Sequence, residues 1–175
     1  MHRCNFGEAL LDKDVTPFDA IVMRPTIVYG LSSSHYGSLF DAAKKAKAGD
    51  GILRIKGSPN AIMHSCHVDD CAEAYVLLAE HPNRKYVANQ AYNVSNSEYE
   101  TGEEVAGAIA EEYGLKAEFV DGVAEWHTTD GLFNFSQWIG SDKIRKLGFM
   151  EKRMPFVQGM SEYRMAYEAF VESKR

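Results

Sequence analysis

One short segment constrains the fold more than any other: Ala20–Gly30, with the sequence Ala-Ile-Val-Met-Arg-Pro-Thr-Ile-Val-Tyr-Gly. Its first residues are apolar and partly β-branched, which is typical of a buried strand. Pro25 has no backbone N–H, so regular strand pairing is expected to stop there. The polar side chains of Thr26 and Tyr29 follow directly. Because α/β proteins bind ligands just beyond the carboxyl ends of their strands, the segment predicts a buried strand and the centre of a pocket.

Around this segment the sequence alternates between predicted strands and helices. Strands are expected where short apolar or β-branched runs lie between turn residues, at 52–55, 61–68, 90–94 and 117–120. The spacing of apolar residues predicts helices at 1–13, 38–48, 69–81, 101–113, 141–147 and from Pro155 onward. Thr101 and Glu104 have the spacing of a capping box, and Ser141 is the predicted N-cap of a later helix. Residues 1–175 are therefore predicted to form one α/β domain.

Composition excludes several classes of function. The net charge of −6 argues against a surface that binds nucleic acid or an anionic membrane. No apolar run reaches the length of a membrane span, and the N-terminus lacks the order of residues found in a secretory signal. The three cysteines show no Cys-x-x-Cys spacing, which is typical of reduced thiols. We therefore expect a cytoplasmic protein.

Four residues near the predicted pocket have side chains suited to proton transfer. His64 is a candidate general acid or base because the unperturbed pKa of imidazole lies near neutrality. The predicted catalytic residues are Tyr29, His35, His64 and Asp69. His64, His67 and Asp69 also invite a metal site, but positions 64 and 67 of one strand point to opposite faces of a sheet. No metal site is predicted.

Three residues allow both a structural and a functional interpretation. Arg24 forms either a structural salt bridge with Asp70 or a contact to substrate. Tyr29 either packs in the core with its hydroxyl bonded to the backbone or faces a substrate. Trp126 lies in an aromatic segment, residues 121–140, which forms either core or the apolar wall of a pocket.

Four motifs, in order and in register, resemble the NAD(P)-dependent epimerase/dehydratase family of extended short-chain dehydrogenase/reductases. They are Arg24-Pro-Thr-Ile-Val-Tyr-Gly30, His67-Val-Asp-Asp-Cys-Ala-Glu-Ala74, Ala91-Tyr-Asn-Val94 with the following capping box, and Leu147-Gly-Phe149. On this resemblance the chain corresponds only to the C-terminal, substrate-binding half of such an enzyme. The resemblance implies a partial Rossmann-like sheet with flanking helices and a small C-terminal substrate-binding lobe.

The resemblance also implies that parts of the family's active site are missing. The family holds its dinucleotide on a glycine-rich turn, and neither G-x-x-G-x-x-G nor G-x-G-x-x-G occurs here. The family's catalytic Tyr and a Lys four residues later lie on one helix. Residues 1–13 resemble the end of that helix, which would place the Lys position near Cys4. We therefore predict no cofactor site in this chain alone, although the family uses NAD or NADP.

Two substitutions bear on the substrate. Family members that act on nucleotide sugars often carry an Asn at the position of Ile27 and an Arg at the position of Met63. Both replacements are apolar, which favours a small molecule other than a nucleotide sugar. The predicted substrate-binding residues are Arg24, Thr26, Ile27, Tyr29, Ser32, Tyr36, Met63, His67 and Trp126.

The sequence leaves three functions open. The chain contributes a substrate pocket to an epimerase/dehydratase-like protein without being competent for hydride transfer alone, or it is a cofactor-independent isomerase or lyase, or it is a non-catalytic interaction module. A partial sheet exposes an edge and an apolar face. We therefore predict a homo-oligomer or pairing with a separate N-terminal Rossmann half.

Overall fold

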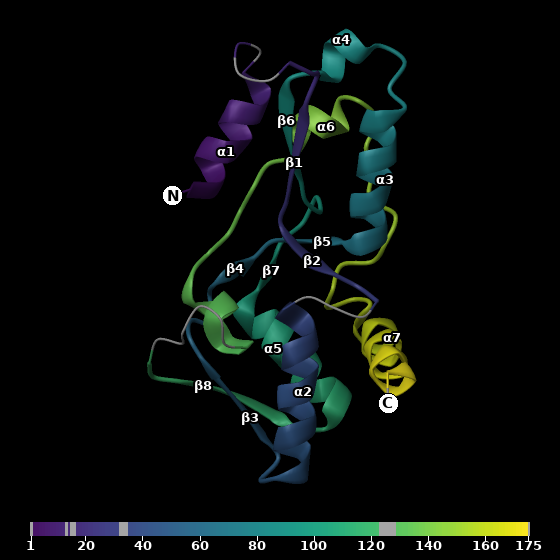
Figure 1. Ribbon diagram of the computed structural model, residues 1–175. Coiled ribbons are helices and arrows are strands. Elements are labelled where there is room, and N and C mark those ends of the chain that lie inside the picture. Colours follow the sequence, from purple (N-terminus) through teal and green to yellow (C-terminus); the bar gives the residue numbers. More distant parts are fainter. Residues whose placement is uncertain (1, 13, 15–16, 32–34, 123–128, 175) are drawn as a thin grey trace.

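The computed structural model describes residues 2–12, 14, 17–31, 35–122 and 129–174, apart from the side chains of residues 2–6, 35, 129 and 130 (Figure 1). The strands in this described part of the chain are β1 Ile21–Pro25, β2 Ile27–Tyr29, β3 Ile52–Lys56, β4 Ile62–Met63, β5 Ser65–His67, β6 Gln90–Val94, β7 Glu100–Thr101 and β8 Lys116–Val120. The helices are α1 His2–Leu11, α2 His35–Ala48, α3 Val68–Ala79, α4 Arg84–Val87, α5 Gly102–Tyr113, the 3₁₀ helix η1 Thr129–Asn134, α6 Asp142–Arg145 and α7 Met160–Ser173.

The strands form four separate two-stranded ladders. The pairs β1–β6, β2–β5 and β3–β8 are parallel, and β4–β7 is antiparallel. An α/β fold with parallel strands and flanking helices is therefore confirmed, with short ladders in place of one continuous sheet.

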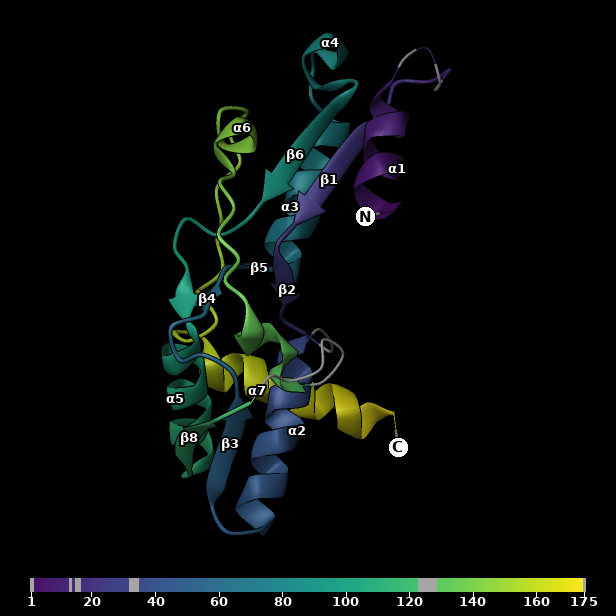
Figure 2. The same cartoon turned by 90° about the vertical axis from the view of Figure 1, so that its left-hand side faces the viewer.

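The ladders divide the molecule lengthwise. At one end, α1 and α3 lie to either side of the β1–β6 pair, and at the other end α2 and α5 lie beside β3–β8 (Figures 1 and 2). Each end has its own hydrophobic core. Tyr92, Leu78 and Ile144 belong to the first, and Phe40, Ile109 and Phe156 to the second. The short ladders β2–β5 and β4–β7 connect the two ends (Figure 2).

The predicted interruption at Pro25 is confirmed, and it changes the strand partner. β1 pairs with β6 as far as Pro25 opposite Val94, and the Thr26 N–H still donates to the Val94 carbonyl at 3.0 Å. From Ile27 the chain pairs with β5 instead. Because proline supplies no ladder donor, the chain leaves one ladder at this point and enters the next.

Several predicted elements differ from the observed ones in their bounds. The predicted strand 61–68 is divided at His64 into β4 and β5, which pair with different strands, and Val68 already belongs to α3. The final helix starts at Met160 and not at Pro155. Ser141 occupies the N-cap position of α6 without a side-chain cap, because its hydroxyl is bonded to Ser95 and Arg145.

Other predicted elements are confirmed. α1, β3, β6 and β8 lie where the sequence placed them, and the capping box of Thr101 and Glu104 is complete. Gly114 ends α5 in the left-handed conformation, with φ of 69°. No helix in the described ranges is long and apolar enough to cross a membrane.

Candidate functional site

Tyr29 ends β2 and belongs to the same core as Phe40, Ile109 and Phe156, and its hydroxyl takes part in a buried polar cluster. Its side chain is fully buried, its hydroxyl donates to the Met154 carbonyl at 2.7 Å, and the Asn96 amide donates to that hydroxyl at 3.2 Å. Burial raises the pKa of Tyr29 above its ordinary value. The geometry matches the structural interpretation of Tyr29, with its hydroxyl bonded to the backbone, and the catalytic and substrate-binding roles of Tyr29 stay predictions.

His64 lies between β4 and β5, where its ring joins two backbone segments. Its Nε2 lies 2.9 Å from the Asn96 carbonyl, and its Nδ1 accepts from the Ile139 N–H at 3.0 Å. Since Nδ1 accepts, Nε2 carries the proton. Burial lowers the pKa of His64, so the ring is neutral at pH 7. Both nitrogens are thus occupied, and proton transfer by His64 requires an opening of this contact.

His67 has a structural role that the sequence did not predict. Its Nδ1 accepts from the Asp69 N–H at 3.1 Å, which makes His67 the N-cap of α3. Its ring packs against Tyr29 and Tyr163, with centroids 5.3 Å from each. Gly30 lies so close that a Cβ there would be 2.3 Å from Nε2 of His67. The end of β5 and the turn after β2 are therefore fitted tightly to each other.

The predicted pairing of Arg24 with Asp70 is wrong. Asp70 is fully buried and accepts from the backbone N–H groups of Lys152 and Arg153, at 3.0 and 3.2 Å. Arg24 is exposed on β1. Asp69 is paired with the Arg153 guanidinium at 3.1 Å, on the surface. The two acidic residues at the start of α3 therefore fix the segment around residue 152.

The predicted substrate-binding residues differ in how exposed their side chains are. Tyr36, which precedes the predicted helix 38–48, lies within α2, is buried, and packs on Phe156 with ring centroids 4.0 Å apart. Met63 is fully buried, and Thr26 is buried with its hydroxyl donating to the Val94 carbonyl at 3.3 Å. Ile27 is half-buried. Ser32, Trp126 and the side chain of His35 lie outside the described residues.

Glu100 is the titratable group that the sequence reasoning missed. It is 8% exposed, one carboxylate oxygen accepts from the Val157 N–H at 2.6 Å, and the other has no hydrogen-bond partner among the described residues. Burial raises its pKa to about 7. Asn96 has a similar buried Oδ1 without a partner in the same part of the chain. A carboxylate directly before the N-cap of a helix is normally exposed. The sequence therefore gave no indication that Glu100 is buried.

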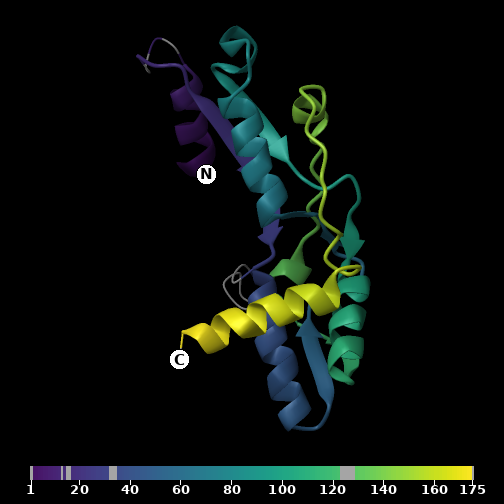
Figure 3. The ribbon, with the colours of Figure 1, turned by 90° about the vertical axis from the view of Figure 1, so that its right-hand side faces the viewer.

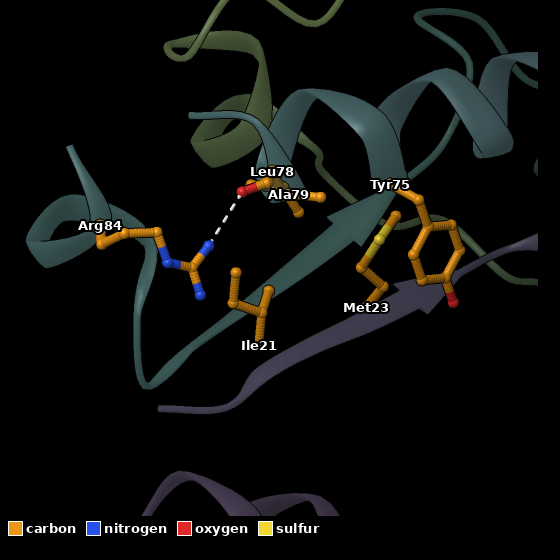
Figure 4. A pocket seen from close by; sticks show the side chains of 6 residues that line it. All are labelled: Ile21, Met23, Tyr75, Leu78, Ala79 and Arg84. Carbon is orange, nitrogen blue, oxygen red and sulfur yellow. Dashed lines mark hydrogen bonds between the residues drawn. The ribbon is translucent and has the colours of Figure 1, made fainter. Parts of the chain in front are cut away.

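The described residues line hollows elsewhere on the molecule. One, of about 350 Å³, lies where β1 passes α3 and is lined by Ile21, Met23, Tyr75, Leu78, Ala79 and Arg84 (Figure 4). Arg84 donates to the Leu78 carbonyl at 3.2 Å across its end. Its walls are otherwise apolar, so the hollow is suited to packing against an apolar group and has few side chains that could take part in a reaction.

The comparisons with known proteins agree with this fold. Residues 12–95 match the model of the NAD dependent epimerase/dehydratase family. Over these residues the chain is similar to that family. It is 26% identical over 169 residues to "Probable GDP-L-fucose synthase 1" of rice (90% of this chain, 48% of that protein). It is 24% identical over 166 residues to the ADP-L-glycero-D-manno-heptose-6-epimerase of Brachyspira hyodysenteriae (93% and 50%).

Solved structures of this family share the fold. The dTDP-glucose 4,6-dehydratase of Bacillus anthracis, in complex with NAD, matches 97% of this chain and 50% of its own, with a TM-score of 0.68 and 19% identity. The UDP-glucose 4-epimerase of Thermus thermophilus, also with NAD, matches 89% and 48%, with a TM-score of 0.62 and 19% identity. The chain thus spans about half the length of the relatives it matches.

The prediction that the likeness is confined to a C-terminal, substrate-binding half was wrong. The family match covers residues 12–95, which hold the parallel pairs β1–β6 and β2–β5, and so the likeness lies in the Rossmann part of the family. The reason is topological. The motifs that follow Pro25 and His67 are strand-to-helix units, and β1, α3 and β6 together form a parallel crossover.

The first turns of α3 and α5 do not suit the pyrophosphate of a dinucleotide. A phosphate at a helix start needs free N–H groups and no competing negative charge. The first turn of α3 holds Asp69 and Asp70, and that of α5 holds Glu103 and Glu104. No three His, Cys, Asp or Glu side chains in the described part of the chain could hold a metal ion.

Proposed function

We propose that this chain contributes a small-molecule substrate site to an epimerase/dehydratase-type protein and does not transfer hydride by itself. The observation that carries the proposal is the change of strand partner at Pro25. It brings the carboxyl ends of β2 and β5 together, at Tyr29 and His67, in the position where α/β proteins bind ligands. Arg24 is exposed near the end of β1 and Ile27 is half-buried at the start of β2, and these two side chains are the proposed substrate contacts.

The buried cluster behind them has a positioning role in this proposal. Tyr29 is bonded to Met154 and Asn96, and Asn96 is bonded to His64. Each of these side chains is fixed by at least one hydrogen bond, and fixed side chains keep a neighbouring binding surface in one geometry. Because the pKa of Tyr29 is raised and His64 is neutral and fully bonded, neither group is poised for proton transfer in this conformation.

Hydride transfer needs a bound nicotinamide, and the chain offers no support for one. It contains no glycine-rich dinucleotide motif, and no Tyr is followed by a Lys four positions later. The acidic first turns of α3 and α5 repel phosphate. Titration of the chain with NADH and with NADPH, followed by nucleotide fluorescence, is expected to show no saturable binding. The Thermus thermophilus UDP-glucose 4-epimerase serves as the positive control. Saturable binding of either nucleotide by this chain alone would overturn the proposal.

The proposed substrate is less charged than a nucleotide sugar. The curated relatives are named for nucleotide sugars. In this chain, however, Met63 is fully buried and Ile27 is apolar, so neither offers a partner to a diphosphate. Calorimetric titration with UDP-glucose is expected to give no saturable heat. A saturable isotherm that weakens on Arg24→Ala would show that a diphosphate is bound and would refute this choice of substrate class.

The proposed partner of this site is a separate chain that carries a glycine-rich dinucleotide-binding fold. In the described part of the chain, β1 pairs with β6 alone, which leaves its other edge without a strand. The hollow beside it is apolar and is lined by Ile21 and Met23 of the strand itself (Figure 4). An open edge beside an apolar hollow favours addition of a strand from another chain. Met23→Glu is expected to abolish co-purification with such a chain, whereas Glu118→Gln, on distant β8, leaves it unchanged.

A cofactor-independent isomerase or lyase has one observation in its favour. The carboxyl group of Glu100 has a pKa of about 7 and one unbonded oxygen, which suits general acid–base catalysis near neutral pH. Turnover of a substrate without nucleotide, lost in Glu100→Gln but kept in Glu118→Gln, would support this second function.

A further inference from the structure

The segment of residues 151–155, here called the strap, lies between α6 and α7 and forms no helix or strand (Figure 3). Its backbone N–H groups at Lys152 and Arg153 donate to the buried Asp70 carboxylate, in the first turn of α3. The side chains of Lys152, Arg153 and Met154 are exposed. A segment that is held through side chains and is exposed on one side opens at a lower cost than a strand within a ladder. The strap can therefore move away from the side chains beneath it.

Two tyrosine hydroxyls beneath the strap donate to one carbonyl oxygen, that of Met154. Tyr29, at the end of β2, and Tyr163, on α7, each donate to it at 2.7 Å. A carbonyl oxygen has two lone pairs, so these two hydroxyls fill its capacity. Two fixed donors at about 2.7–3.1 Å from one oxygen are the arrangement with which enzymes hold the carbonyl oxygen of a substrate. The Met154 carbonyl, a neutral amide oxygen, thus occupies a position that suits the oxygen of a ligand.

The two hydroxyls are fixed by groups other than the strap carbonyl. The Asn96 amide donates to the Tyr29 hydroxyl at 3.2 Å. The rings of Tyr29 and Tyr163 meet edge to face, with centroids 5.1 Å apart, and the Tyr163 ring stacks on Phe156 with an angle of 7° between the planes. A Cβ at Gly159 would be 2.4 Å from the Tyr163 ring, so the backbone there lies directly against it. Donors that are fixed in advance bind a ligand at a smaller entropic cost.

Both hydroxyls keep their protons at neutral pH. Burial raises the pKa of Tyr163 to about 12 and also raises the pKa of Tyr29 above its ordinary value. The two groups therefore act as hydrogen-bond donors and transfer no proton.

The charges around the two hydroxyls are mainly negative. Besides burial, three carboxylates act to raise the pKa of Tyr29 or Tyr163, and the Arg153 guanidinium acts to lower that of Tyr163. The carboxylates are Glu100, Asp70 and Glu162. A ligand that carries a carboxylate would add a like charge to this group, whereas a neutral carbonyl oxygen adds none. The surroundings therefore favour a neutral ligand.

We propose that the hydroxyls of Tyr29 and Tyr163 bind the carbonyl oxygen of a small neutral ligand, which displaces the Met154 carbonyl from the same position. The exchange replaces two hydrogen bonds with two equivalent ones, and the released carbonyl of the exposed strap can bond to water. The proposal rests on the proposed function, because Tyr29 ends β2 at the proposed substrate site. It names the chemical class that this site takes, namely a ketone, aldehyde or amide without a charged group.

Displacement of the Met154 carbonyl can be observed directly by NMR. Met154 and Pro155 form the only Met-Pro pair in the sequence, so the full chain labelled with [1-¹³C]methionine and [¹⁵N]proline gives one carbonyl signal with a ¹³C–¹⁵N coupling. Titration with acetophenone is expected to move this signal upfield and to saturate, because the carbonyl carbon loses the deshielding of two hydrogen bonds. Ethylbenzene, which has the same ring without the oxygen, is expected to leave the signal in place. An unmoved signal with acetophenone, or an equal shift with ethylbenzene, would overturn the proposal.

The dissociation constant from the same titration tests the two donors. Tyr29→Phe and Tyr163→Phe each remove one hydroxyl and are expected to raise the dissociation constant of acetophenone about threefold to tenfold. Tyr167→Phe is the matched control, because it removes a hydroxyl from the same helix that is bonded to Asp41, and it is expected to leave the constant unchanged. Circular dichroism confirms that each variant is folded.

Two results of these titrations would contradict the proposal. One is an unchanged dissociation constant in both Tyr29→Phe and Tyr163→Phe. The other is tighter binding of benzoate than of acetophenone, because benzoate presents a carboxylate in place of the neutral carbonyl. Either result leaves the proposed function standing, since that function is tested by the nucleotide titrations. Conversely, saturable binding of NADH would overturn the proposed function without changing the signal of the Met154 carbonyl.

Discussion

Replacement of Glu100 by Gln is expected to change how the free energy of unfolding depends on pH. The carboxyl group is 8% exposed and holds the Val157 N–H at the start of the segment that leads into α7. Gln has nearly the same shape and keeps an oxygen that can accept from this N–H. It removes only the titration, so the comparison isolates the effect of the buried charge.

The magnitude follows from the pKa of the two states. Burial raises the pKa of Glu100 from its ordinary 4.5 to about 7 in the folded chain. Between these values the folded protein binds a proton that the unfolded chain has released, so its contribution to stability is fully present below 4.5 and is lost as the pH rises through 7. At 1.36 kcal/mol per pKa unit, a rise from about pH 5 to about pH 8 costs the wild type about 2.5 kcal/mol.

Urea unfolding followed by circular dichroism measures this difference. We expect the stability of Glu100→Gln relative to wild type to increase by about 2.5 kcal/mol between about pH 5 and pH 8. His64 and His67 titrate in both proteins and therefore cancel in the comparison. Glu118→Gln, at an exposed position of β8, is the matched control and should give a curve parallel to that of the wild type. Parallel curves for Glu100→Gln as well would refute the assignment of a buried, neutral carboxyl group.

Two further substitutions each remove a hydrogen-bonded hydroxyl group. Tyr29→Phe removes the hydroxyl that donates to Met154 and accepts from Asn96, and is expected to lower the free energy of unfolding by about 1–2 kcal/mol; an unchanged urea midpoint would show that this cluster adds nothing to stability. Thr101→Ala removes the side chain that accepts from the Glu104 N–H at 3.2 Å, and is expected to cost about 1 kcal/mol, whereas Thr101→Ser, which keeps the hydroxyl, should retain most of it in the same assay.

The sequence predicted local elements well where one residue decides the backbone. Pro25 ends β1 because it cannot donate to the ladder, and Gly114 ends α5 because it takes a positive φ at no steric cost. Thr101 and Glu104 lie three positions apart, so their reciprocal cap forms within one turn. In each case the interaction is between near neighbours in the chain.

The sequence failed where the partner lies far away. A salt bridge with Arg24 was one of the two interpretations that involve Asp70, but Asp70 accepts from the amides of Lys152 and Arg153, more than eighty positions later. His67 was predicted to contact a substrate and is the N-cap of α3, because its strand ends at His67 itself, one residue earlier than predicted.

The candidate site shows the same difference between what depends on local sequence and what depends on distant contacts. The sequence by itself determined that polar side chains follow Pro25 at the end of a strand, and it identified Tyr29 and His64 by the chemistry of their side chains. Only the tertiary structure decided that both are buried, through contacts with Met154, Asn96 and Ile139. It also decided that Glu100 is enclosed next to Val157. Hydrogen-bonding capacity is a property of each residue, whereas the pKa depends on how much water the rest of the chain removes from around it.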